Sequence, residues 1–329
     1  MNQRRLLLIV VVAFWLYGAK LNAQALSDSC DVPVVVADYF NQSVRNLTRA
    51  DFSVRLNDAA TPVASASIDA GPKRIAIVID ASRNVPAEEW KFETEMASEF
   101  VKHARPGDQF AFSVIGAEAS PAELLLSSQV LDRLQGLSSN TNERIYDALL
   151  AAARRLDPPQ FGDAVVLFGH HEDTGSETPA SDLQNLMVKN GVRFFAVSFA
   201  NPLPPGFDPR KPVPKGSLSK LQLLTSETGF FFSFHPIAAL NMPGQLPLFE
   251  NFLSDVYTWI AEPYRLTLPR PANNDLAKLE VTVSGMETRK VHRDGIRYPR
   301  SLYPCSARPE KLSDAASERP TTNDLRLQQ

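Results

Sequence analysis

The strongest constraint on the fold is a short apolar segment that ends in an aspartate. It reads Arg74-Ile-Ala-Ile-Val-Ile-Asp80, and two polar side chains, Ser82 and Asn84, follow at alternate positions. A run this apolar and this rich in Ile and Val predicts a strand of a parallel sheet, buried on both faces. Ligand sites of open α/β sheets lie just beyond the carboxyl ends of such strands. The segment therefore predicts a site at Asp80, Ser82 and Asn84.

Strands and helices alternate through residues 72–261. Further strands are predicted at 109–115, 164–168, 192–199 and 230–234, with 124–126 in or near another, and helices at 85–104, 143–156, 183–189, 217–227 and 248–260. The helix at 143–156 is amphipathic, with apolar residues at helical spacing. Alternation of this kind favours a parallel sheet with helices on both faces, so the predicted fold class is α/β.

The segments on either side of this region read as β-strands. They are predicted at 34–36, 47–52 and 62–68 in an N-terminal β segment (26–71), and at 264–268, 278–283 and 288–291 in a C-terminal one (262–305). A sheet of only two or three strands is marginally stable on its own. Either both segments form one small β module into which the α/β domain is inserted, or each is a separate hairpin-like extension. The last residues, 306–329, lack aromatic groups and predict a disordered tail.

Residues 1–25 have the features of a secretory signal peptide. Arg4 and Arg5 precede an apolar core at 6–17, and Ala23-Gln-Ala25 offers small residues for cleavage. The apolar core is shorter than the roughly 20 residues that a membrane-spanning helix needs. We therefore expect an exported protein, periplasmic, cell-surface or secreted, with no stable membrane span after cleavage. An uncleaved N-terminal anchor is the alternative.

The chain has only two cysteines, Cys30 and Cys305. In an exported protein an even pair favours a disulfide over two free thiols. The bridge would join the first strand of the mature protein to its last ordered segment. In the chain-entropy model, a disulfide that closes such a long loop stabilises the folded protein by about 5 kcal/mol. Two unpaired, buried thiols are the alternative.

Composition and motifs argue against several functions. The formal net charge is −3, and no basic run is interleaved with aromatic residues, so nucleic-acid binding is not expected. The chain has no Gly-x-Ser-x-Gly nucleophile elbow and no glycine-rich phosphate loop. The sequence therefore offers no familiar signature of a serine hydrolase or a nucleotide-binding enzyme.

Several short segments, taken in order, resemble bacterial exported proteins with a von Willebrand factor type A (VWFA)-related domain, of the kind abundant in acidobacteria. They are Val34–Asp38, Val44–Val54, Asp80–Asn84, Ile145–Leu149, Val165–Phe168 with Glu172–Ser176, Glu227–Gly229 and Tyr264–Leu268. The resemblance covers most of the mature chain. It implies a Rossmann-like, doubly wound sheet for 72–261 and an exported location. Most members of this family have no assigned activity.

The metal-site pattern of that family is altered here. The resemblance implies a magnesium ion bound by an Asp-x-Ser-x-Ser loop, a threonine of a second loop and an aspartate of a third, with the partner's carboxylate completing the shell. This chain keeps Asp80 and Ser82 but has Asn84 in place of the second serine. Alignment on the later motifs puts Glu143 at the threonine position and His170 at the third-loop aspartate position.

Besides magnesium binding of the type that the resemblance implies, with the Asn84 amide oxygen as a ligand, three interpretations of this degenerate site remain open. In the first, the five residues form a metal-free face of a non-enzymatic binding module, which needs no cofactor and binds a protein or a cell-surface polymer. In the second, a divalent ion such as zinc or manganese is bound by Asp80, Ser82 and His170. Asp80, Glu143 and His170 would then serve a metal-dependent hydrolase. In the third, the protein is a structural component of the cell envelope.

Overall fold

A computed structural model of the chain describes residues 29–80, 87–115, 123–135, 144–169, 173, 175–200, 220–228, 231–236, 246–270, 276–286 and 291–302. All of these except Ser29 belong to one unit, Cys30–Pro304. The predicted signal peptide at 1–25 and the predicted tail at 306–329 lie outside the described residues, as does Cys305. Within the described ranges, no helix is both long and apolar enough to cross a membrane.

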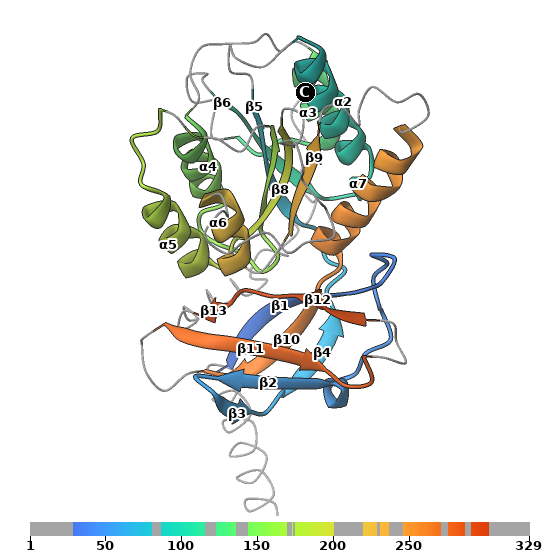
Figure 1. The fold of residues 1–329 in the computed structure, drawn as a ribbon, viewed down its shortest axis with the longest axis vertical. Helices are drawn as coiled ribbons and strands as arrows, with labels where there is room; N and C mark the ends of the chain where they lie inside the picture. The colour runs from blue at the N-terminus through green and yellow to red at the C-terminus, as the bar shows by residue number, and fades with distance from the viewer. Residues whose placement is uncertain are drawn as a thin grey trace, which may run out of the picture. The chain divides into compact units, whose positions relative to one another are not determined.

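A five-stranded parallel sheet forms the centre of the α/β part (Figure 1). Its strands are β5 (Arg74–Asp80), β6 (Gln109–Ile115), β7 (Ala164–Gly169), β8 (Arg193–Ala200) and β9 (Phe231–Pro236). They lie in the order β6-β5-β7-β8-β9. This is the doubly wound arrangement, and the direction of winding reverses between β5 and β7. The carboxyl end of β5 therefore lies at the switch point of the sheet.

Helices cover both faces of this sheet (Figure 1). One layer contains α2 (Ala87–Lys102), α3 (Ser127–Gln135) and α7 (Leu246–Ala261), and the other contains α4 (Ile145–Arg154), α5 (Ala180–Asn190) and α6 (Lys220–Thr228). Successive residues of β5 face opposite layers, since Ile77 packs in the first core and Val78 in the second. The predicted α/β fold class, a Rossmann-like doubly wound sheet, is confirmed.

The two flanking segments build two antiparallel sheets together. The N-terminal segment contributes β1 (Ser29–Asp38), β2 (Phe52–Leu56), β3 (Ala59–Thr61) and β4 (Ser65–Ile68), and a 3-10 helix, η1 (Arg49–Asp51); the C-terminal segment contributes β10 (Tyr264–Pro269), β11 (Ala277–Val283), β12 (Val291–Arg297) and β13 (Ser301–Leu302). The sheet orders are β12-β1-β10-β4 and β13-β11-β2-β3. Each sheet contains strands of both segments, so they form one β module rather than two separate hairpins.

Some strand boundaries differ from the sequence-based prediction. The first strand extends over Ser29–Asp38 rather than 34–36, and of the segment 62–68 only Ser65–Ile68 is a strand. Of the strand predicted at 288–291, residues 288–290 lie outside the described residues, and the described strand extends over Val291–Arg297. Three charged or imidazole side chains and Gly295 interrupt the apolar pattern of that strand. The domain boundaries at 72 and 261 stay predictions.

A buried ion pair connects the amino ends of β5 and β7. The Arg74 guanidinium donates to both carboxylate oxygens of Asp163, at 3.0 Å and 2.5 Å. It also donates to the carbonyls of Leu156 and Pro158. Burial raises the pKa of the Asp163 carboxyl, although the bonds from Arg74 oppose that rise. The pair fixes the relative position of the two strands whose other ends meet at the switch point.

Candidate functional site

Asp80 and Gly169 lie side by side at the carboxyl ends of β5 and β7. Asp80 is the last residue of β5 and is fully buried. Gly169 ends β7 with a φ of 149°, a backbone conformation that residues with a side chain rarely adopt. A Cβ atom added at Gly169 would stand 2.3 Å from the Cβ atom of Asp80. Asp80 lies at the carboxyl end of a buried parallel strand, as predicted, and the sheet order makes this end the switch point. Gly169 leaves room for its side chain.

The other four predicted site residues, Ser82, Asn84, Glu143 and His170, lie outside the described residues. The ligand-binding face and the metal set of Asp80, Ser82 and His170 therefore stay predictions. In the part of the chain that the structure describes, no group of three or more His, Cys, Asp or Glu side chains is arranged to hold a metal ion.

The first turn of α4 is capped by the segment that follows β7. This β7–α5 segment is described as Asp173 and residues 175–179. Arg144, the N-cap residue of α4, makes no capping bond with its side chain. Instead, Asp173 Oδ1 accepts from the backbone N–H groups of Ile145 at 2.8 Å and Tyr146 at 3.3 Å. Ser176 Oγ accepts from the N–H of Asp147 at 3.2 Å. These acceptors satisfy N–H groups that have no partner within a helix.

Asp147 of α4 in turn accepts hydrogen bonds from the backbone of the β7–α5 segment. Its carboxylate accepts from the N–H groups of Glu177 at 3.1 Å and Thr178 at 2.9 Å. Burial raises the pKa of the Asp147 carboxyl, but the hydrogen bonds from Thr178 and Glu177 lower it more, so that pKa lies below its usual value. On the neighbouring residue, burial and the charge of Asp173 raise the pKa of the Tyr146 hydroxyl to about 12.

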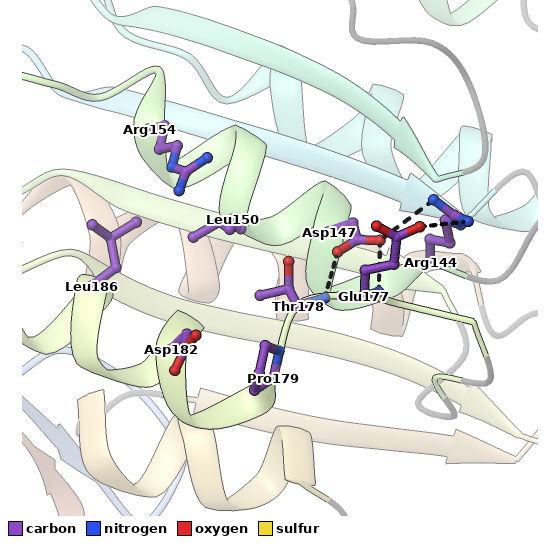
Figure 2. Close-up of a pocket in the computed structure, with 9 residues that line it drawn as sticks. All are labelled: Arg144, Asp147, Leu150, Arg154, Glu177, Thr178, Pro179, Asp182 and Leu186. Atoms are coloured by element: carbon purple, nitrogen blue, oxygen red, sulfur yellow. Dashed lines mark hydrogen bonds and ion pairs between the residues drawn. The ribbon is translucent and has the colours of Figure 1, made fainter.

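A groove lies between α4 and α5 beside these contacts (Figure 2). Its volume is about 670 Å³, and its lining residues are Arg144, Asp147, Leu150, Arg154, Glu177, Thr178, Pro179, Asp182 and Leu186. The Arg144 guanidinium lies 3.9 Å from the carboxylate of Asp147 and 3.2 Å from that of Glu177. The groove is open and carries charges of both signs, whereas small-molecule sites enclose most of their ligand's surface.

Sequence reasoning assigned no role to Gly169, Asp147, Asp173 or Ser176. The last three lie within motifs that carry the VWFA resemblance, but their partners are about thirty residues away in the sequence. The residue types gave a weak signal, because Asp and Ser are common helix-capping acceptors and the two stand three residues apart. No pattern at that spacing identifies α4 as the helix that is capped.

Comparisons with known proteins concern the fold alone. No protein-family model and no curated protein sequence matches the chain. A solved von Willebrand factor type A structure from Catenulispora acidiphila is similar, with a TM-score of 0.44 and 13% identity over 84% of this chain and 74% of that one. The VWA domain of SpRpn10 gives a TM-score of 0.37 and 17% identity over 56% of this chain and 94% of that one. Both structures are VWFA domains, the family that the sequence motifs also resemble.

Proposed function

We propose that this protein is an exported, non-enzymatic binding protein built on a VWFA-like module. Its ligand is another protein or a cell-surface polymer, bound at the face predicted from Asp80, Ser82, Asn84, Glu143 and His170. The observation that supports this most is the position of Asp80 at the switch point of a doubly wound sheet, where such folds bind their ligands.

The proposal does not include a bound metal. Magnesium requires near-octahedral oxygen ligands, and the substitutions in this chain replace a hydroxyl by Glu143 and a carboxylate by His170. An imidazole nitrogen does not suit magnesium, so the donor set does not fit the ion that the resemblance implies. The same set of two carboxylates and an imidazole is better suited to zinc or manganese. A transition-metal hydrolase using Asp80, Glu143 and His170 is therefore the second candidate.

Metal content distinguishes these two candidates. The purified mature protein, Asp80→Ala and His170→Ala are dialysed against mixed divalent ions and measured by elemental mass spectrometry. Asp132→Ala, which removes an exposed carboxylate on α3, is the control. We expect no retained metal in any of the four proteins. About one equivalent of zinc or manganese, lost in Asp80→Ala and His170→Ala and kept in the control, would contradict the proposal and favour the hydrolase.

Ligand binding is tested with the cell-envelope fraction of the native host, used untreated and after protease digestion. Retention on the immobilised protein is compared with that on Asp80→Asn and on Asp58→Asn, a matched change at an exposed aspartate of the β2–β3 turn. We expect Asp80→Asn to lower retention about tenfold or more, as central interface residues do, and Asp58→Asn to have no effect. Loss of retention after digestion would identify a protein ligand. Equal retention by all three proteins would contradict ligand binding at this face and favour the structural envelope role.

Export is tested on the protein released by the native host. An intact mass that matches a chain beginning at Leu26 would show cleavage after Ala25, as the signal-peptide pattern predicts. A mass that includes residues 1–25 would instead favour the uncleaved anchor.

A further inference from the structure

The start of α4 and the β7–α5 segment exchange hydrogen bonds in both directions. Asp173 accepts from the backbone of α4, and Asp147 of α4 accepts from the backbone of the β7–α5 segment. Each segment therefore supplies acceptors for N–H groups that its partner leaves unsatisfied. Figure 2 shows the Asp147 half of this exchange, with Arg144 reaching across to Glu177.

Ser176 links the two halves of the exchange. Its hydroxyl donates to Asp173 Oδ1 at 2.5 Å and accepts from the N–H of Asp147 at 3.2 Å. The hydroxyl thus contacts both the residue that caps α4 and the residue of α4 that holds the segment. Loss of either carboxylate changes the surroundings of this hydroxyl, so the two halves are not independent.

We propose that the first turn of α4 and the β7–α5 segment form one cooperative unit, and that Asp173 is its positioning residue for the ligand-binding face. The unit is attached to the carboxyl end of β7, where Gly169 touches Asp80. Asp173 thus stands only four residues after the strand end that lies beside Asp80. The presence of a ligand at this face rests on the proposed function, whereas the cooperative unit does not.

Asp173 has this role rather than Asp147 because of where its charge lies. Its carboxylate accepts from four donors, the N–H groups of Ile145, Tyr146 and Ser176 and the hydroxyl of Ser176. It stands at the N-terminus of α4, where the partial positive charge of the helix favours an anion. Asp147 lies in the first turn of α4 and holds two N–H groups of the β7–α5 segment from the helix side. Of the two carboxylates, only that of Asp173 belongs to the segment that follows β7 in the sequence.

Amide hydrogen exchange tests the unit on the protein alone. In Asp173→Ala, exchange should rise about tenfold at Ile145 and Tyr146, the amides that lose their acceptor. In a cooperative unit it also rises at Glu177 and Thr178, which bond to Asp147 and not to Asp173. Asp147→Ala should show the converse, with faster exchange at Ile145 and Tyr146. Changes confined to the directly bonded amides in both variants would overturn the proposal.

Three further variants make this result specific. Asp173→Asn keeps an Oδ1 acceptor and should restore most of the protection that Asp173→Ala loses. Asp182→Ala removes another carboxylate that lines the same groove and should leave Ile145 and Tyr146 unchanged. Where Asp173→Ala does not fold, Ser176→Ala carries the same test, because it removes one bond on each side of the unit.

The positioning role is tested by retention of the cell-envelope fraction described above. Asp173→Ala should lower retention about tenfold with Asp80 in place, and Asp173→Asn should restore it. Full retention by Asp173→Ala, together with loss in Asp80→Asn, would overturn the positioning role and leave the proposed function intact. No effect of Asp80→Asn would overturn the proposed function, and with it any role of the unit in binding.

Discussion

The Cβ atom of Asp80 occupies the space that a side chain on Gly169 would need. A Cβ added at Gly169 would stand 2.3 Å from it, and 3.3 Å from the backbone nitrogen of Asp80. Real Cβ atoms essentially never approach another non-bonded atom to 2.3 Å, so β5 and β7 can lie this close only because residue 169 has no side chain. The position of Asp80 at the switch point therefore depends on the residue that ends the neighbouring strand.

Gly169→Ala should lower the free energy of unfolding by about 3 kcal/mol, because it combines overpacking with an unfavourable backbone conformation. The measurement is urea denaturation of the mature protein. Gly191→Ala is the matched control, since Gly191 also has a positive φ, 64°, but nothing within 4 Å of an added Cβ. We expect Gly191→Ala to lower the free energy of unfolding by only about 1 kcal/mol. Equal losses in the two variants would contradict the steric explanation.

Removal of one partner of the Arg74–Asp163 pair should destabilise the protein strongly. Asp163→Asn leaves the Arg74 guanidinium buried without a counter-ion, and such changes cost about 3–5 kcal/mol. The measurement is the free energy of unfolding from urea denaturation. Asp58→Asn removes an aspartate from an exposed pair with Lys278 and should cost less than about 0.5 kcal/mol. A loss in Asp163→Asn as small as in this control would show that the buried charge finds other partners.

Acidification should weaken the connection between α4 and the β7–α5 segment. The pKa of the Asp147 carboxyl is lowered below 3.8 in the folded protein. Its contribution is therefore complete above the unfolded pKa and is lost as the pH falls through the lowered folded value. The difference in unfolding free energy between the wild type and Asp147→Asn should be constant between about pH 6 and pH 7 and should shrink below about pH 4. A difference that grows on acidification would contradict the assignment.

The pair of cysteines should be oxidised in the exported protein. Cys30 is fully buried on β1, and the structure has no free cysteine among its described residues. Without reductant, alkylation of the unfolded protein should label neither Cys30 nor Cys305, and with reductant it should label both. Reduction, or the double change to serine, should lower the free energy of unfolding by at least about 2 kcal/mol. Labelling of both cysteines without reductant would favour the two free thiols.

Buried elements with strong local patterns could be predicted from the sequence. The run that ends at Asp80 is apolar because β5 is buried on both faces, so the pattern gives both the strand and the position of its final carboxylate. The sequence pattern did not predict α3, which has only Val130, Leu131 and Leu134 as large apolar residues. A single apolar stripe of three residues is too short to stand out from a polar loop.

Features that depend on distant pairing could not be predicted. The sequence left open whether the flanking segments form one module, because nothing local in β2 specifies β11 as its neighbour. The same limit applied to the candidate site. The capping partner of Asp173 and the contact of Gly169 with Asp80 both depend on which strands and helices the sheet order brings together. Chain topology, rather than local propensity, sets these relationships.

The β module takes its strands from both ends of the chain, and this determines when the protein can finish folding. The Tyr264 hydroxyl donates to the Val44 carbonyl across 220 residues of chain, and β1 pairs with β12 across the whole α/β part. The first strands to leave the ribosome are therefore among the last to find their partners, whereas the parallel sheet assembles from segments made in between. Until the last strands emerge, the early ones expose unpaired edges to other chains and to proteases. Newly made protein should thus remain sensitive to digestion near its N-terminus until synthesis, and any transport of the unfolded chain, is complete.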